Sequence, residues 1–228
     1  KDTKIVGLSR QQLGAEDVYN NLQSDSGTDA SVITAMHSKT KMLKLASGST
    51  EDYSKLLEVL NELEAKDGVC MNRIYYLSVP PKLFKETVAN LGKADLNKSC
   101  PHSAASTRIL VEKPFGNDYA SAKELVNDVG AVFKEEQIFR VDHYLAKETV
   151  QNILTFRSEN PIFKAIWNKD QIQSIDIIGS EKIGIEGRVN FYEGVGAMRD
   201  LIQSHLLQLL AVVTMDLPED LSDTASIH

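Results

Sequence analysis

Residues 73–91 decide the fold, and they read Arg73-Ile-Tyr-Tyr-Leu-Ser-Val-Pro-Pro-Lys-Leu-Phe-Lys-Glu-Thr-Val-Ala-Asn-Leu91. The first seven residues are rich in aromatic and β-branched side chains and predict a strand. That strand must stop at Pro80-Pro81, because two prolines remove two backbone donors and disfavour helix at the residue before them. A helix is predicted directly after the prolines, over Leu83–Leu91.

The same order of strand and helix recurs on both sides of this stretch. Lys4–Leu8 and Arg108–Glu112 predict buried strands. Helices are predicted over Thr50–Leu63, where apolar residues are spaced by three and four, and after the capping residue Asp118. Strands that alternate with helices favour parallel pairing, so the sequence predicts an α/β fold with one flank of a doubly wound sheet.

After about residue 143 the pattern changes. Helices are predicted over Lys147–Phe156 and Ala197–Val213, and alternation predicts strands over Ile172–Ile178 and Arg188–Glu193. This second region is expected to be part of an α+β domain with a mostly antiparallel sheet. The expected domains are residues 1–143 and 144–228.

Composition and charge narrow the range of partners. The chain has 228 residues, of which 42% are hydrophobic and 25% charged, which is typical of a folded protein. Its 25 Lys and Arg against 32 Asp and Glu give a net charge of −7, which does not favour nucleic acid or an anionic membrane. An anionic ligand must therefore be bound by a few local cations. No run approaches the roughly 18 apolar residues of a membrane span, so a soluble protein is expected.

Two cysteines, Cys70 and Cys100, are too few for a disulfide framework or a four-ligand zinc site. Cys100 and His102 lie two residues apart, but no second pair of ligands is near them in the sequence, which argues against a metal site. So few cysteines are typical of a reducing compartment such as the cytoplasm.

Two polar clusters lie where functional residues are expected. Lys113 follows a predicted strand, and open α/β sheets bind ligands outside the carboxyl ends of their strands. His143, Tyr144 and Lys147 place an imidazole, a phenol and an ammonium at a predicted helix start, where they can converge on a phosphate. The alternatives are a charged strand exit at Lys113 and a solvated helix entry at Lys147.

His205 has two interpretations. It shares a helical stripe with Leu201, Leu209 and Val212, which indicates a buried structural histidine. Asp200 is nearby on the same predicted helix, and a buried histidine oriented by a carboxylate is the usual apparatus of a general base. The residues alone leave both interpretations open.

Gly194-Val-Gly196-Ala-Met-Arg199 partly matches a dinucleotide-binding loop. We reject that assignment, because Arg199 stands where Gly or Ala is needed for close packing of helix and strand, and no βαβ unit follows.

With these residues described, the chain resembles the glucose-6-phosphate dehydrogenases over nearly its whole length. The stretches that carry the resemblance are Arg108-Ile-Leu-Val-Glu-Lys-Pro-Phe-Gly116, the residues from Phe139 to Leu154 around Asp142-His-Tyr144, Ile166-Trp-Asn168, Ile185-Glu-Gly-Arg188 and Met198-Arg-Asp-Leu-Ile-Gln-Ser-His205. It is looser over Lys4–Thr107. The family pattern has Gly where this chain has Ala146 and Asn where it has Ser204.

The resemblance implies a fold, a reaction and a set of roles. It implies a partial Rossmann-like domain that binds NADP, followed by the first part of a catalytic domain, and oxidation of glucose 6-phosphate at C1 to 6-phosphogluconolactone in the oxidative pentose phosphate pathway. His205 is the implied general base and Asp142 the residue that orients it. The implied substrate-binding residues are Lys113, His143, Tyr144, Lys147, Glu186 and Asp200. The implied cofactor-binding residues are Arg10, Pro80, Lys113 and Pro114.

The resemblance also implies a cytoplasmic homo-oligomer, a dimer or tetramer, and no resident metal. The family's Gly-rich phosphate loop is expected before Lys1 and most of its large sheet after His228, so we expect an internal piece of a longer chain. Two alternatives stay open: a dehydrogenase of another sugar or hexose phosphate, and a catalytically incomplete segment that only binds sugar phosphate.

Overall fold

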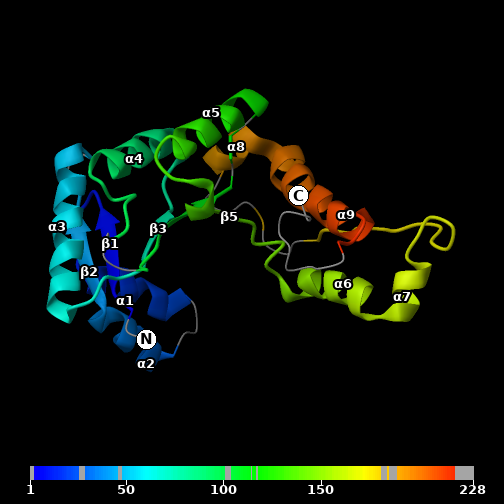
Figure 1. Ribbon diagram of the computed structural model, residues 1–228, viewed down its shortest axis with the longest axis horizontal. Coiled ribbons are helices and arrows are strands. Elements are labelled where there is room, and N and C mark those ends of the chain that lie inside the picture. Colours follow the sequence, from blue (N-terminus) through cyan, green and yellow to red (C-terminus); the bar gives the residue numbers. More distant parts are fainter. Residues whose placement is uncertain are drawn as a thin grey trace. The chain divides into compact units, whose positions relative to one another are not determined.

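The computed structural model describes residues 3–25, 29–45, 48–100, 104–113, 115–116, 118–180, 184 and 189–218 (Figure 1). The chain divides into two units, Lys1–Val111 with Lys123–Phe139 and Glu112–Ala122 with Arg140–His228. Within the described residues, no helix is both long enough and apolar enough to cross a membrane. The domain boundary predicted at residue 143 stays a prediction.

The first unit alternates strands and helices. In chain order its elements are β1 (Ile5–Ser9), α1 (Ala15–Asp25), α2 (Ala30–Ser38), β2 (Thr40–Lys44), α3 (Thr50–Asp67), β3 (Arg73–Leu77), α4 (Pro81–Lys93), β4 (Thr107–Glu112), α5 (Tyr119–Gly130), the 3-10 helix η1 (Glu135–Gln137) and β5 (Ile138–Val141). β4, α5 and β5 each continue into the second unit by one or more residues.

The strands form parallel pairs, as the sequence predicts. β1 pairs with β2 with Ile5 opposite Thr40, and β3 pairs with β4 with Arg73 opposite Thr107. β5 lies on the other side of β4, which gives the order β3-β4-β5. The α/β, Rossmann-like class is therefore confirmed.

Local sequence explains where these helices begin and end. Pro81 opens α4, because a proline is tolerated in the first helical turn, where its missing N–H has no intrahelical partner. α3 has Glu51 and Asp52 in its first turn and ends at Gly68, which adopts the left-handed conformation at φ 67°. α1, α2, β2 and β5 are not among the elements predicted from the sequence.

The first unit is most deeply buried around β4. Its largest fully buried side chains are Phe133, Leu91, Leu96, Ile109, Val88 and Thr107. They come from α4, from the turn after it, from β4 and from the segment after α5. Burial of this apolar surface is what positions the carboxyl end of β4 and the residue that follows it.

In the part that the structure describes, the second unit is helical after β5. Its elements are α6 (Glu148–Glu159), α7 (Pro161–Ile166), α8 (Val189–Ala197), the π-helix η3 (Met198–Leu206) and α9 (Leu207–Thr214). The helices predicted over 147–156 and 197–213 are confirmed. The last is continuous but its first half is π-helical.

Both strands predicted in this unit are wrong. Ile172–Ile178 has no regular structure, and Val189–Ala197 is a helix, whereas a strand over Arg188–Glu193 was expected. A strand is stable only beside a neighbour that pairs with its backbone, and no described segment pairs with either stretch. The expected antiparallel sheet is therefore not seen among the described residues.

Buried polar contacts hold the helices of the second unit together. Arg157, on α6, donates to the carbonyls of Val212 at 2.6 Å and Met215 at 2.7 Å. Trp167 donates from Nε1 to the carbonyl of Val213 at 2.9 Å. These contacts satisfy carbonyls at the end of α9 that no residue of the helix itself reaches.

Candidate functional site

The site is built on the ends of two neighbouring strands. Lys113 directly follows β4, and Asp142 directly follows β5. Lys113 Nζ donates to Asp142 Oδ2 at 2.5 Å and to the carbonyl of Ser204 at 2.7 Å. Both side chains are largely buried, with 21% of Lys113 and 13% of Asp142 exposed. This charge-assisted pair joins the strand ends to η3.

Asp142 is held as a carboxylate. Its Oδ1 accepts from the backbone N–H of Tyr144 at 3.0 Å and of Leu145 at 3.4 Å. Partial burial by itself would raise the pKa of Asp142, but the hydrogen bond and positive charge of Lys113, aided by the two backbone donors, lower it below 3.8.

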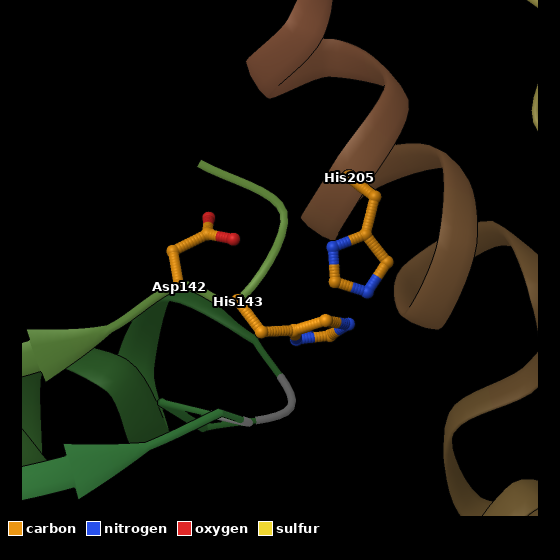
Figure 2. Close-up of side chains that lie close together, drawn as sticks. All are labelled: Asp142, His143 and His205. Carbon is orange, nitrogen blue, oxygen red and sulfur yellow. The ribbon is translucent and has the colours of Figure 1, made fainter. Parts of the chain in front are cut away.

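His205 is enclosed by two rings from the segment after β5. Its imidazole stacks on the Tyr144 ring with centroids 3.9 Å apart and an interplanar angle of 15°. The His143 ring meets it edge-on at 4.7 Å. Only 7% of His205 is exposed, and its Nδ1 has no hydrogen-bond partner among the described residues. Figure 2 shows Asp142, His143 and His205 gathered around one point.

This environment keeps His205 neutral. Burial lowers the pKa of His205 below 6.5, and the positive charges of His143 and Lys113 lower it further. Asp142 and Asp200 act in the opposite direction, because their negative charges favour the imidazolium. A neutral imidazole flanked by carboxylates can accept a proton and then be stabilised as a cation.

The π-helical geometry of η3 sets where its backbone carbonyls lie. Ser204 Oγ donates to the carbonyl of Arg199, five residues earlier, at 2.8 Å, and the carbonyl of Ser204 itself receives Lys113. The preceding helix α8 is kinked at Gly196, whose φ of 70° favours glycine. Single turns of π-helix are often found at functional sites.

Lys147 and His143 give the site accessible hydrogen-bond donors. Lys147 is the residue before α6, and its ammonium lies 3.8 Å from the centroid of the Tyr144 ring. Both Lys147 and His143 are exposed, whereas Tyr144 is buried. A dianion such as a phosphate fits donors that converge at a helix N-terminus.

One group of possible metal ligands occurs in the described ranges. One ligand atom each from Asp142, His143 and His205 lie within 4.8 Å of one another. Both oxygens of Asp142 already accept hydrogen bonds, and Lys113 lies beside them. The group therefore fits a proton-transfer site better than a resident cation.

The structure brings together most of the predicted site residues, all in the second unit: Lys113, Asp142, His143, Tyr144, Lys147, Asp200 and His205. Arg10 and Pro80 lie in the first unit, Arg10 exposed directly after β1 and Pro80 exposed at the start of α4. Pro114 and Glu186 lie outside the described residues. The roles given to all these residues stay predictions.

Family models cover the chain from end to end. Residues 1–152 match "Glucose-6-phosphate dehydrogenase, NAD binding domain", and residues 154–228 match "Glucose-6-phosphate dehydrogenase, C-terminal domain".

The chain belongs to the glucose-6-phosphate dehydrogenase family.

Curated relatives and solved structures agree with this family. The chain is 40% identical over 221 residues to glucose-6-phosphate 1-dehydrogenase 2 of Mycobacterium bovis, covering 94% of the chain and 42% of the relative. It is 38% identical over 222 residues to the glucose-6-phosphate 1-dehydrogenase of Aggregatibacter actinomycetemcomitans, covering 96% and 44%. The chain thus spans less than half the length of these relatives.

Two solved structures of the family have a similar backbone. One is a glucose-6-phosphate dehydrogenase in complex with its substrate glucose 6-phosphate, with a TM-score of 0.82 and 34% identity over 96% of this chain and 46% of that one. The other, from Mycobacterium avium, has a TM-score of 0.81 and 35% identity over the same shares.

Two contacts of the site residues were not predicted from the sequence. The carbonyl of Ser204 is a main-chain acceptor for Lys113, and no side-chain pattern signals it. The stacking of Tyr144 on His205 joins segments 61 residues apart, which periodicity within one element does not detect. The sequence held one indication that His205 has partners outside its own helix, which is the cluster of polar residues around it on an otherwise apolar helix.

Proposed function

We propose that this chain carries the substrate-binding and proton-transfer part of an NADP-dependent glucose-6-phosphate dehydrogenase, which oxidises C1 of glucose 6-phosphate to 6-phosphogluconolactone. The observation that carries the proposal is the neutral, buried His205 beside the Lys113–Asp142 pair, with His143 and Lys147 exposed next to it. The reaction needs a base at the C1 hydroxyl and a hydride acceptor at C1, and binding of the substrate needs groups that hold its phosphate.

His205 is the proposed base. Its pKa is lowered, so at neutral pH the imidazole is free to take the hydroxyl proton from C1. The charge that then develops on the ring faces the carboxylates of Asp142 and Asp200, whose charges stabilise it. Asp142 is itself held in place by Lys113 and two backbone donors, so it does not need to reorganise during the transfer.

The phosphate is proposed to bind at His143, Tyr144 and Lys147. Lys147 contributes a full positive charge at the start of α6, where the helix dipole also favours an anion. Glu186 and Asp200 are proposed to accept hydroxyls of the sugar, and Lys113 to contact both substrate and cofactor. Binding at three such points would hold C1 at His205.

The first unit is the proposed cofactor domain. Arg10 follows the carboxyl end of β1 and is exposed, as a partner of the 2′-phosphate of NADP must be, and Pro80 follows β3. Pro114 completes the proposed set. When bound, NADP supplies the hydride acceptor. A cytoplasmic homo-oligomer, a dimer or tetramer acting in the pentose phosphate pathway, is part of the same proposal.

Activity tests the proposed base directly. In the full-length enzyme that contains this segment, we expect His205→Asn to lower the rate with glucose 6-phosphate and NADP by about 10²–10⁴. His37→Asn is the control, because His37 is 47% exposed and lies on α2 in the other unit. A His205→Asn variant that keeps most of its rate would show that another group is the base.

Binding tests the phosphate site on the chain itself. We expect glucose 6-phosphate to raise the melting temperature and free glucose to have no such effect. Lys147→Gln should abolish this stabilisation, whereas Lys164→Gln, an exposed lysine on α7, should leave it unchanged. Equal stabilisation by glucose and its 6-phosphate would favour a dehydrogenase of another sugar.

A further inference from the structure

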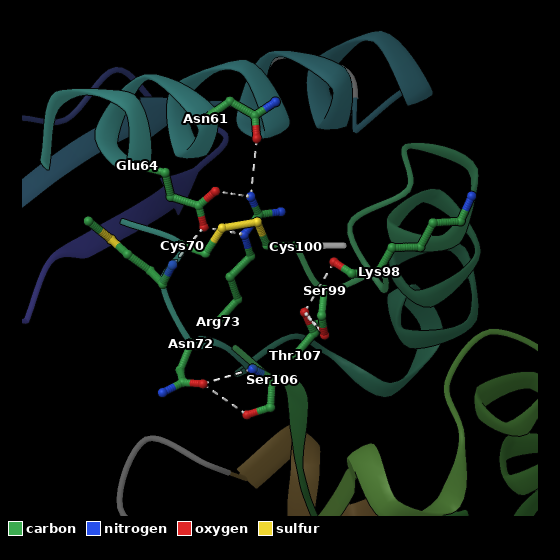
Figure 3. The surroundings of a disulfide bond; sticks show 11 residues. Asn61, Glu64, Cys70, Asn72, Arg73, Lys98, Ser99, Cys100, Ser106 and Thr107 are labelled. Carbon is green, nitrogen blue, oxygen red and sulfur yellow. Dashed lines mark hydrogen bonds and ion pairs between the residues drawn. A yellow bond between two sulfur atoms is a disulfide. The ribbon is translucent and has the colours of Figure 1, made fainter. Parts of the chain in front are cut away.

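Cys70 and Cys100, whose pairing is not predicted from the sequence, are joined in a disulfide. They are 30 residues apart, with Cα atoms 6.0 Å from each other, which is within the usual range for this bond. Figure 3 shows the bond between the segment that leads into β3 and the segment that leads into β4.

The bond lies at the amino edge of the β3–β4 pair. Two residues separate Cys70 from β3, and Cys100 lies in the connection before β4. The strands are parallel, so their other ends, which lead to Pro80 and Lys113, are at the opposite edge. Five residues of strand separate the two edges by about 17 Å. The bond therefore lies at the opposite end of these strands from Pro80 and Lys113.

Hydrogen bonds hold the Cys70 side without the disulfide. Glu64 accepts from the backbone N–H of Met71 at 3.1 Å and from Arg73 Nη2 at 2.9 Å. Arg73 is mostly buried and also donates to Asn61 Oδ1 at 3.1 Å. The chain beside Cys70 is thus tied to α3.

The Cys100 side is held in the same way. Thr107 Oγ1 donates to the carbonyl of Lys98 at 3.2 Å, and Ser99 Oγ donates to Thr107 Oγ1 at 3.3 Å. Asn72 Oδ1 accepts from the backbone N–H of Ser106 at 2.8 Å, which links the two segments directly. These contacts keep the two thiols next to each other after reduction, so the effective concentration of one at the other stays high.

We propose that Cys70 and Cys100 are a reversible thiol–disulfide pair whose oxidation stabilises the β3–β4 region without altering the candidate site. Both residues are partly exposed, so a small thiol or disulfide can reach them. This proposal does not depend on the reaction proposed above. In reducing compartments, disulfides are usually transient or redox-sensing.

The chemistry needs a small-molecule disulfide as oxidant. The thiolate of one cysteine attacks it and releases one small thiol, and the thiolate of the other cysteine then displaces the second. Two protein thiols lose two electrons and two protons, and the small disulfide is reduced to two thiols. Excess small thiol drives the same steps backwards.

The effect is expected on stability, because the bond closes a loop that contains β3 and α4. Closing a loop of this length restricts the unfolded chain and is expected to raise the melting temperature by about 5–15 °C. In the native state the bond should slow opening of the strands that start beside it.

The test compares the oxidised and reduced chain, after treatment with oxidised and reduced glutathione, by thiol titration and hydrogen exchange. We expect no titratable thiols after oxidation and two after reduction, with slower exchange in β3 and β4 of the oxidised form and equal exchange in α6. Cys70→Ser and Cys100→Ser should exchange and melt like the reduced wild type in both buffers.

Three results would overturn the proposal. The first is that the oxidised sample still has two thiols or carries stable adducts with glutathione. The second is that the bond persists in excess reduced glutathione. The third is that the oxidised and reduced forms have equal melting temperatures. The comparison of oxidised with reduced wild type needs no substitution, so a serine variant that folds poorly does not affect it.

Discussion

At the scale of single residues, the site depends on where each charge is placed. The side chain of His205 is buried from solvent, and the Lys113 ammonium donates hydrogen bonds to a carboxylate and to a main-chain carbonyl. Neither feature follows from the net charge of −7, because what matters is the set of groups within a few ångströms. Two predictions follow from these local environments.

The first concerns stability against pH. The pKa of His205 is lowered in the folded state, so below about 6.5 the unfolded chain binds more protons at this residue than the folded one. Its contribution to stability is full above the unfolded pKa and is lost as the pH falls. We expect wild type to lose more stability than His205→Gln between pH 7.5 and pH 5.5 in urea unfolding. Parallel curves for the two proteins would contradict this expectation.

The second concerns the ion pair. Asp142→Asn leaves the Lys113 ammonium in a mostly enclosed place with weaker acceptors, and we expect a loss of about 1–3 kcal/mol in the free energy of unfolding. Urea unfolding at pH 7 measures it. Asp170→Asn, on an exposed turn, is the control and should change stability by less than about 0.5 kcal/mol. A similar loss in both variants would show that the Lys113–Asp142 pair contributes no more to stability than an exposed carboxylate does.

At the scale of elements, the end of α3 is a sensitive point. Gly68 has φ 67° with nothing near its missing Cβ, so a side chain there meets only the cost of the backbone conformation. We expect Gly68→Ala to lower the free energy of unfolding by about 1 kcal/mol.

Gly130 gives the matched comparison. It ends α5, has no positive φ, and also has open space at its missing Cβ. Gly130→Ala should be neutral or stabilising by up to about 1 kcal/mol, because alanine restricts the unfolded chain. The two variants can be measured side by side by thermal unfolding. Equal effects of the two changes would mean that the conformation of Gly68 is not what its substitution disturbs.

The elements also show how far sequence reasoning reaches. β3 and α4 follow from the two prolines between them, and β4 from a short apolar run that ends at a charged residue. The segment 172–178 alternates as a strand does, yet alternation states only which face a side chain would take, and pairing requires a partner. His205 and Asp142 were predicted to be site residues, and the structure places them close together. The contact of Lys113 with the Ser204 carbonyl and the Cys70–Cys100 bond depend on distances that only the fold sets.

At the scale of the whole molecule, the chain has two units, each with its own buried residues. The single tryptophan, Trp167, belongs to the second unit, while the disulfide belongs to the first. The fluorescence of Trp167 therefore reports on the second unit, and reduction of the disulfide changes the first unit.

This division makes a testable prediction. Reduction of the disulfide should lower the midpoint of the transition seen by far-ultraviolet circular dichroism more than that seen by Trp167 fluorescence in the same urea series. Cys100→Ser, which cannot form the bond, is the control and should show no change on reduction. Equal shifts of the two midpoints in wild type would indicate that the units unfold as one.

The π-helical stretch Met198–Leu206 has a consequence for how this gene tolerates change. Loss of a single codon between Asp200 and Ser204 would let the helix relax to ordinary α spacing. That change would turn the residues upstream by about 100° relative to α9. Every side chain at the site would still be encoded, yet Asp200 would be turned to another face of the helix than His205 and the Ser204 carbonyl. The length of this segment therefore matters to the site, and not only the identity of the histidine it carries.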